Sequence, residues 1–236
     1  MQTLPESTLT SAPDAQLLDR FAADGEDAAF SELVRRHLPL VLAVTRRRLG
    51  NSGLAEDAAQ QVFIALSRKL RSRHTIPCLP AWLQKAAVFE ASTVARTERR
   101  HRRRVELAKD HWPASAPDRD NLQLDQALAA LPERDRQVLL LHHFEKLPFA
   151  GVARRLGISE AAAQRRGHRA LEKLRSVLRS KGVERDANAC SLWLAASLAP
   201  AGTSVSPDLV TRIVSLKGVA AQTLPWIPIA AVLTLA

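Results

Sequence analysis

Apolar residues recur at three- and four-residue intervals through most of the chain up to residue 180, and nowhere do they alternate for long. This spacing lines apolar side chains along one face of an α-helix, whereas strict alternation would indicate strands. In the first hundred residues it predicts four helices, which begin near Asp14, after Gly25, near Leu54 and near Pro80. Asp14 is expected to cap the first of them. The pattern therefore predicts an all-α fold.

One interruption divides this helical pattern into two parts. Residues 108–121 contain two prolines and no helical stripe, which is typical of a linker. We expect two small helical domains, 14–107 and 122–181, joined by this linker. Residues 186–236 differ from both in composition and are predicted to be a separate C-terminal extension.

The second domain contains a pattern typical of a helix-turn-helix. Pro148 precedes a short helix over residues 149–156, and Gly157 is placed to end that helix because glycine reaches the left-handed conformation without strain. Ser159 is a favourable N-cap for the helix that follows. In a helix-turn-helix, this second helix enters the major groove of DNA.

The two faces of that second helix differ in character. Small and apolar residues recur along one face, which is expected to meet the core. The opposite face is expected to carry the DNA-binding candidates Gln164, Arg165, His168 and Arg169, which can donate to base edges and phosphates. An ordinary solvated helix face is the alternative, and the spacing does not separate base contacts from phosphate contacts.

Charge is distributed unevenly along this chain of formal net charge +10. Residues 1–32 hold seven acids and one arginine, whereas residues 96–104 hold six arginines and one glutamate. Guanidinium groups this dense repel one another unless a polyanion lies alongside, so we expect them to contact phosphates. The DNA-binding candidates in this run are Arg96, Arg99, Arg100, Arg102, Arg103 and Arg104.

Nothing in the sequence indicates an enzyme. There is no Gly-rich phosphate loop, no suggestive group of Ser, His and acid, and no cofactor motif, so no catalytic residue is assigned. Cys78 and Cys190 are the only cysteines and have no partners at metal-ligand spacing, so we expect neither a metal site nor a disulfide. The first residues have no apolar secretory segment, which favours the cytoplasm.

The C-terminal extension leaves several alternatives open. Residues 186–236 hold two acids and two bases, and residues 218–236 are uncharged and nearly long enough to cross a bilayer. A membrane-spanning segment, a hairpin that packs on the DNA-binding domain or on a partner, and a disordered tail all fit this composition. The protein is therefore expected either in the cytoplasm or attached to a membrane through this segment.

Two runs of residues resemble one family. The run AEDAAQQVF at residues 55–63 resembles region 2 of RNA polymerase sigma factors of the extracytoplasmic-function (ECF) group. The runs LAALPERDR at 128–136 and LGISEAAAQRRGHRALEKLR at 156–175 resemble region 4 of the same factors. The resemblance extends over about residues 14–180.

The resemblance implies a promoter-specificity subunit whose partners are core RNA polymerase and promoter DNA, with an anti-sigma protein as a further candidate. It implies that Asp57, Gln60 and Gln61 bind the polymerase, that the arginine run lies at the −10 element, and that the helix-turn-helix reads the −35 element. The loop 71–80 is the candidate place for a pocket that takes an unstacked base. Gly167 stands where the family has a bulky residue, so that helix is expected to pack loosely.

Two other functions remain open on the residues alone. One is a helix-turn-helix regulator that binds DNA without joining polymerase, for which only the DNA-binding candidates matter. The other is a membrane-associated interaction protein whose basic helices meet anionic lipid.

Overall fold

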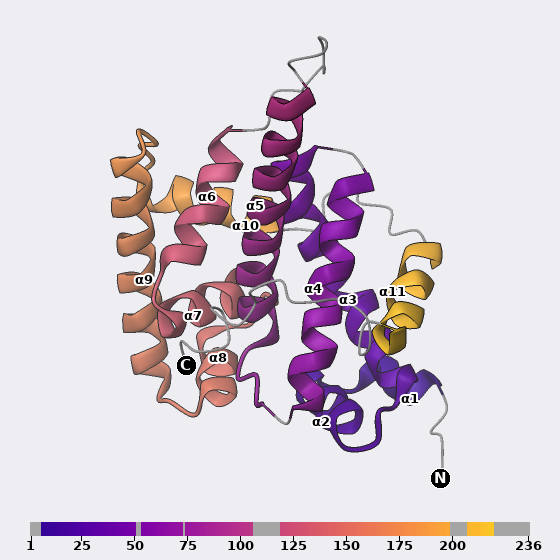
Figure 1. Cartoon of the computed structure of the whole chain (residues 1–236). Coiled ribbons are helices and arrows are strands. Elements are labelled where there is room, and N and C mark those ends of the chain that lie inside the picture. Colours follow the sequence, from indigo (N-terminus) through magenta and orange to yellow (C-terminus); the bar gives the residue numbers. More distant parts are fainter. Residues whose placement is uncertain (1–5, 51–52, 73, 106–118, 199–206, 220–236) are drawn as a thin grey trace.

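The computed structural model describes residues 6–50, 53–72, 74–105, 119–198 and 207–219, and all regular structure within these ranges is helical (Figure 1). The predicted all-α fold is confirmed. The helices of the first half are α1 (Glu6–Ser11), α2 (Asp14–Asp24), α3 (Asp27–Leu49), α4 (Gly53–Arg71) and α5 (Leu79–Val105). They are followed by α6 (Arg119–Ala130), α7 (Glu133–His143), α8 (Phe149–Leu156), α9 (Glu160–Ser180), α10 (Ala187–Leu198) and α11 (Pro207–Val219).

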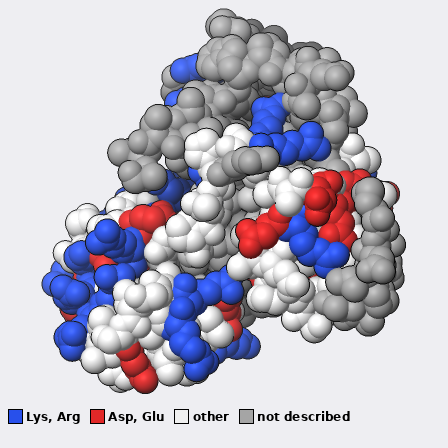
Figure 2. Space-filling view, turned by 90° about the horizontal axis from the view of Figure 1, so that it is seen from below, with Lys and Arg blue, Asp and Glu red and all other residues white. Residues whose placement is uncertain are grey.

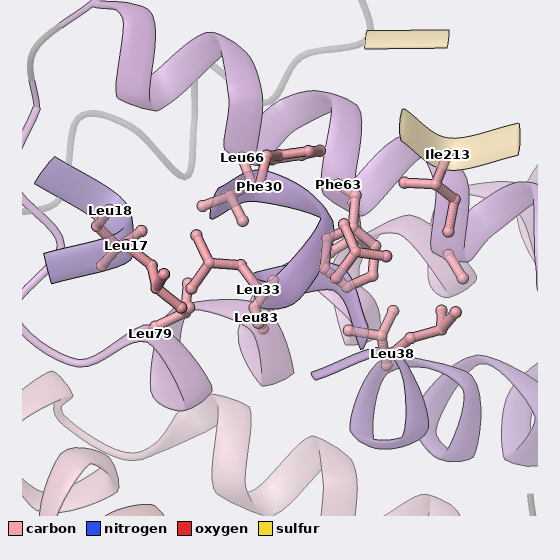
Figure 3. Close-up of a cluster of buried hydrophobic side chains, with 14 of the residues drawn as sticks. Leu17, Leu18, Phe30, Leu33, Leu38, Phe63, Leu66, Leu79, Leu83 and Ile213 are labelled. Atoms are coloured by element: carbon pink, nitrogen blue, oxygen red, sulfur yellow. The ribbon is translucent and has the colours of Figure 1, made fainter. Parts of the chain in front are cut away.

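Helices α2 to α5 surround the first hydrophobic core. Phe30, Leu33, Phe63 and Leu83 are fully buried there and come from three different helices (Figure 3). The chain turns between α2 and α3 at Gly25, whose φ of 67° is the left-handed conformation that glycine tolerates. The first half is therefore a helical bundle with its own core.

Asp14 does not cap a helix, contrary to the prediction. Pro13 occupies the N-cap position of α2, and the side chain of Asp14 is buried. Its carboxylate lies 2.7 Å from Nε2 of His37 and accepts a hydrogen bond of 3.0 Å from Arg36. Burial alone would raise the pKa of Asp14, but hydrogen bonds and charges from His37 and Arg36 hold this pKa below its usual value. Asp14 thus ties α2 to α3.

Helices α6 to α9 surround the second core, which includes Leu128, Val138, Leu140 and Leu174. Arg136 is almost completely buried at its edge and donates hydrogen bonds to the backbone carbonyls of Ala81, Ala129 and Leu131, and to Glu133. Buried carbonyl groups need such donors. Helix α6 begins at Arg119, so it includes the last three residues of the predicted linker; the linker residues 108–118 lie outside the described residues.

The two halves pack directly against each other. Leu40, Cys78 and Ala81 of the first half are buried in the second cluster. Across this contact, Arg47 makes a two-pronged ion pair with Asp125, with both N–O distances at 2.7 Å and both side chains largely buried. The amide of Gln84 also donates to the backbone carbonyl of Asp125 at 3.0 Å. We call this arrangement, in which the two halves pack on each other, the closed state.

The two helices that the structure describes within the C-terminal extension pack on the rest of the protein, but on different halves. Helix α10 lies against α7 and α9, where Cys190, Leu194 and Leu198 join the second core. Helix α11 lies against α3 and α4, where Leu209 and Ile213 join the first core (Figures 1 and 3). Of the alternatives for the extension, packing on the DNA-binding domain thus applies to α10. The two helices do not pair as a hairpin, because their apolar faces fit separate cores.

Most of the predicted span at residues 218–236 lies outside the described residues. None of the helices that the structure describes is both long enough and apolar enough to cross a membrane.

Candidate functional site

The local geometry of α8 and α9 is that of the predicted helix-turn-helix. Gly157 ends α8 with φ 63° and ψ 36°, and its N–H donates to the carbonyl of Ala153. Ser159 caps α9, because its hydroxyl accepts a hydrogen bond of 3.2 Å from the N–H of Ala162. The predicted turn and cap are both confirmed, and α8 and α9 pack on each other.

Helix α9 presents one exposed polar face and one buried face. All four candidates on it are exposed, namely Gln164, Arg165, His168 and Arg169. Within the described ranges neither Arg165 nor Arg169 forms an ion pair, so their charges are available to an anion. Figure 2 shows many Lys and Arg, with a few Asp and Glu among them, on the side of the molecule where α8 and α9 lie, and the largest group of Asp and Glu on the opposite side. This face fits a polyanion.

Gly167 does not loosen the packing of α9, contrary to the expectation. A Cβ atom at this position would lie 2.8 Å from Cε1 and 3.1 Å from Cζ of Phe149. The ring of Phe149 is held on another side by His142, whose ring stacks on it at 4.3 Å between centroids. Glycine therefore lets α9 approach α8 closely, and the position demands a small residue. Because Phe149 belongs to α8, the sequence of α9 alone does not predict this contact.

The arginine run forms the end of α5, which extends past its neighbouring helices in Figure 1. Arg96, Arg99 and Arg100 are at least partly exposed, and Arg102 to Arg104 continue the same helix with side chains outside the described ones. Burial and the charge of Arg99 together lower the pKa of Arg48 at the end of α3. This end of the bundle thus holds several cations close together, as phosphate contact requires.

The three candidates for protein contact lie on α4 but differ in exposure. Asp57 is exposed and Gln61, one turn later, is half-buried. Gln60 is buried, with 9% of its surface exposed. The neighbouring acid Glu56 has its carboxylate 3.8 Å from Arg46 of α3 and 3.0 Å from Arg212 of α11. The contact with Arg212 joins residues 156 positions apart, so no local pattern indicates it.

The loop between α4 and α5 borders a hollow of about 650 Å³. His74, Thr75 and Ile76 of the loop line it together with residues of α2 and with Arg155 of α8. The hydroxyl of Ser72 lies 2.8 Å from Nδ1 of His74. The structure thus places an open hollow with a cation and an imidazole at the loop where the sequence predicted a pocket.

The described residues contain no group of three or more His, Cys, Asp or Glu side chains that could hold a metal ion. Both cysteines are free and buried. Burial raises the pKa of the Cys78 thiol to about 12, so this thiol stays protonated and a poor nucleophile.

Comparison with known proteins gives a consistent result for both halves. Residues 33–101 match the family model described as Sigma-70 region 2, and residues 121–174 match the model described as Sigma-70, region 4. The chain is 33% identical over 170 residues to RNA polymerase sigma factor CarQ of Myxococcus xanthus, which covers 68% of this chain and 95% of CarQ. It is 32% identical over 161 residues to ECF RNA polymerase sigma factor SigF of Caulobacter vibrioides, covering 66% of this chain and 89% of SigF.

Among solved structures, the chain is similar to CnrH, whose structure was determined in complex with the cytosolic domain of CnrY. The identity is 22%, the TM-score is 0.34, and the match covers 71% of this chain and 99% of CnrH.

Proposed function

The chain belongs to the extracytoplasmic-function group of RNA polymerase sigma factors, and we propose that three of its surfaces divide the work of directing core polymerase to promoters. One surface on α4 binds the polymerase. The other two, the exposed face of α9 and the basic end of α5, bind promoter DNA. The polymerase supplies the chemistry, and this chain supplies the choice of promoter.

The observation that carries the assignment to DNA is the exposed face of α9. Gln164, Arg165, His168 and Arg169 project from an N-capped helix after a glycine turn, and the arginines have no carboxylate partner among the described residues. Arginine and glutamine can hydrogen-bond base edges in the major groove, and arginine also holds phosphates. We assign this face to the −35 element.

The basic end of α5 is assigned to the −10 element. Arg96, Arg99 and Arg100 are accessible on it, and the arginines at 102–104 continue the helix. Such a density of positive charge favours DNA backbone contact and makes affinity depend steeply on salt. The hollow beside His74 borders the start of α5, at the opposite end of this helix from the arginines, so we assign it no contact with the −10 element.

The polymerase-binding surface is assigned to Asp57 and Gln61, together with Gln60 after a local rearrangement that exposes it. The carboxylate of Asp57 repels a phosphate backbone, whereas a carboxylate with two amides can pair with cations and hydrogen-bonding groups of a protein. Because Gln60 is buried in the structure, only part of this surface is exposed in the closed state.

In vitro transcription with purified core polymerase tests the assignment. D57A/Q61A is expected to lower the affinity for core at least about tenfold, the effect of losing about 1.4 kcal/mol of binding free energy, while direct binding to a DNA fragment is unchanged. R165A/R169A should leave core binding intact and abolish promoter-dependent initiation. R179A is the matched control, since this arginine lies at the far end of α9 with an exposed side chain.

A DNA-binding regulator that acts without polymerase would give a different result. D57A/Q61A would then act like the wild type in every assay, and the wild type itself would not bind core.

A further inference from the structure

Helix α11 covers part of the α3 and α4 surface through one apolar face. Leu209 and Ile213, four residues apart, are each only 1% exposed and belong to the first core. Val210 and Val214 are partly buried against the same cluster. Thr211, Arg212 and Ser215 are exposed. Helix α11 is therefore an amphipathic helix seated on the bundle, and Ile213 points into the same cluster as Phe63 of α4 (Figure 3).

An ion pair joins α11 to the first turn of α4. Nη2 of Arg212 lies 3.0 Å from Oε2 of Glu56, while the other carboxylate oxygen of Glu56 lies 3.8 Å from Arg46 of α3. Glu56 is thus held between two cations from two different helices. It directly precedes Asp57 in the sequence.

The seat of α11 overlaps the side of α4 that carries Gln60. Glu56, Gln60 and Phe63 follow one another at four- and three-residue spacing, which places them on one side of α4. Arg212 contacts the first of these residues, and the cluster that includes Ile213 contains the last. Packed helix axes lie about 8–10 Å apart, so a second helix cannot approach this side of α4 while α11 is in place.

We propose that α11 is a built-in competitor for the polymerase-binding surface: it covers the Glu56–Gln60 side of α4 in the free protein and leaves it when core polymerase binds. This proposal rests on the proposed function, because it takes Asp57, Gln60 and Gln61 as the polymerase contacts. The occupant of the surface in the free state is this chain's own residues 207–219, seated there by apolar burial and by the Arg212–Glu56 pair.

The competition has a definite thermodynamic form. If polymerase binds only the state in which α11 is released, the apparent dissociation constant is the intrinsic one divided by the released fraction. A released fraction of about one tenth weakens binding about tenfold. Variants that loosen α11 should therefore bind core more tightly, although their own folded state is packed less well.

The test compares full-length variants in fluorescence-anisotropy titrations with purified core polymerase. L209A/I213A shortens the two buried side chains. R212E reverses the charge that faces Glu56; because Arg212 is exposed, this variant is expected to fold like the wild type. S215A is the matched control on the exposed face of α11. The expected result is an affinity for core about tenfold higher for L209A/I213A, a smaller increase for R212E, and no change for S215A.

Hydrogen exchange supplies the second measurement. Amides of α11 in the wild type should lose protection when core binds, whereas amides of α9 should keep theirs. Equal or weaker core binding by both L209A/I213A and R212E, with circular dichroism that shows an intact fold, would overturn the proposal, and so would α11 amides that stay protected in the complex. Failure of the proposed function is distinct, because then neither the wild type nor the loosened variants bind core.

Discussion

Replacing Gly167 by alanine tests the close approach of α8 and α9. In an ordinary helix interior this substitution stabilises the folded state by about 1 kcal/mol, because alanine has the higher helix propensity and restricts the unfolded chain. Here the new methyl would meet the ring of Phe149 at 2.8 Å, a distance at which one of the two must move. The substitution therefore has two opposing effects on stability, a gain from the higher helix propensity of alanine and a loss from the clash with Phe149.

The surroundings of Phe149 decide which effect is larger. Its ring stacks on His142 at an interplanar angle of 15°, and Nδ1 of His142 lies within 2.8 Å of the carbonyl of Leu147. Val138 Cγ1 would lie 3.5 Å from the new methyl on the remaining side. Forcing an extra methyl into such a contact costs about 1–3 kcal/mol. We expect G167A to be destabilising by about 1 kcal/mol, which corresponds to a fall in Tm of roughly 2–4 °C for a chain of this size.

Urea unfolding followed by circular dichroism measures this change. G151A is the matched control: a methyl at Gly151, within α8, would have its nearest neighbours at an ordinary 3.5 Å, so this variant should be stabilised by about 0.5–1 kcal/mol. In an F149L background the clash is relieved, and G167A should become neutral or stabilising. If G167A alone stabilises the protein as much as G151A does, the close approach of the two helices is refuted.

Three further predictions concern the interface, the pH response and DNA. R47A should destabilise the protein by about 3–5 kcal/mol in urea unfolding, because it leaves the carboxylate of Asp125 buried without its partner; a change below about 1 kcal/mol would contradict this. Burial, helped by the charge of a neighbouring histidine, lowers the pKa of His143 to about 4, below its unfolded value of 6.5, so stability should fall as the pH falls from 6.5 towards 4. This fall should be smaller in H143Q, and equal pH profiles would show that His143 is not its source. R165A should make the slope of log K for DNA against log salt less steep by about 0.9 for each phosphate that the side chain no longer neutralises. An equal change of slope in R179A would mean that the effect is not specific to this face.

The helices of both halves were largely predictable, because their signals are local. Gly25 and Gly157 end helices in the left-handed conformation, and Ser159 caps the next one three residues from its hydrogen-bond partner. The exposed face of α9 followed from the same helical spacing. Features of this kind depend on neighbours within a few residues, and the sequence displays those neighbours directly.

The contacts that the sequence did not predict join residues far apart in the chain. Asp14 looked like a cap but pairs with His37, 23 residues later. Gly167 looked like a weak point because its partner, Phe149, belongs to another helix. Gln60 looked like a surface residue because it is polar and close to Asp57 and Gln61, yet it is buried in the folded chain. In each case tertiary packing, which periodicity does not encode, reversed the local interpretation.

The extension and the contact between the two halves are physically linked through Arg47. This single side chain binds Asp125 of α6 with two hydrogen bonds and donates a third, at 3.1 Å, to the backbone carbonyl of Ser197 in α10. Asn121 of α6 in turn accepts hydrogen bonds from Trp193 and Ser197 of α10. Separation of the two halves therefore breaks the Arg47 contacts to α6 and to α10 together. A polymerase that separates them would thus free α10 from the first half, while Cys190, Leu194 and Leu198 keep it packed in the second core. Because α11 packs on α3 and α4 of the first half, its release and the opening of the halves break different contacts.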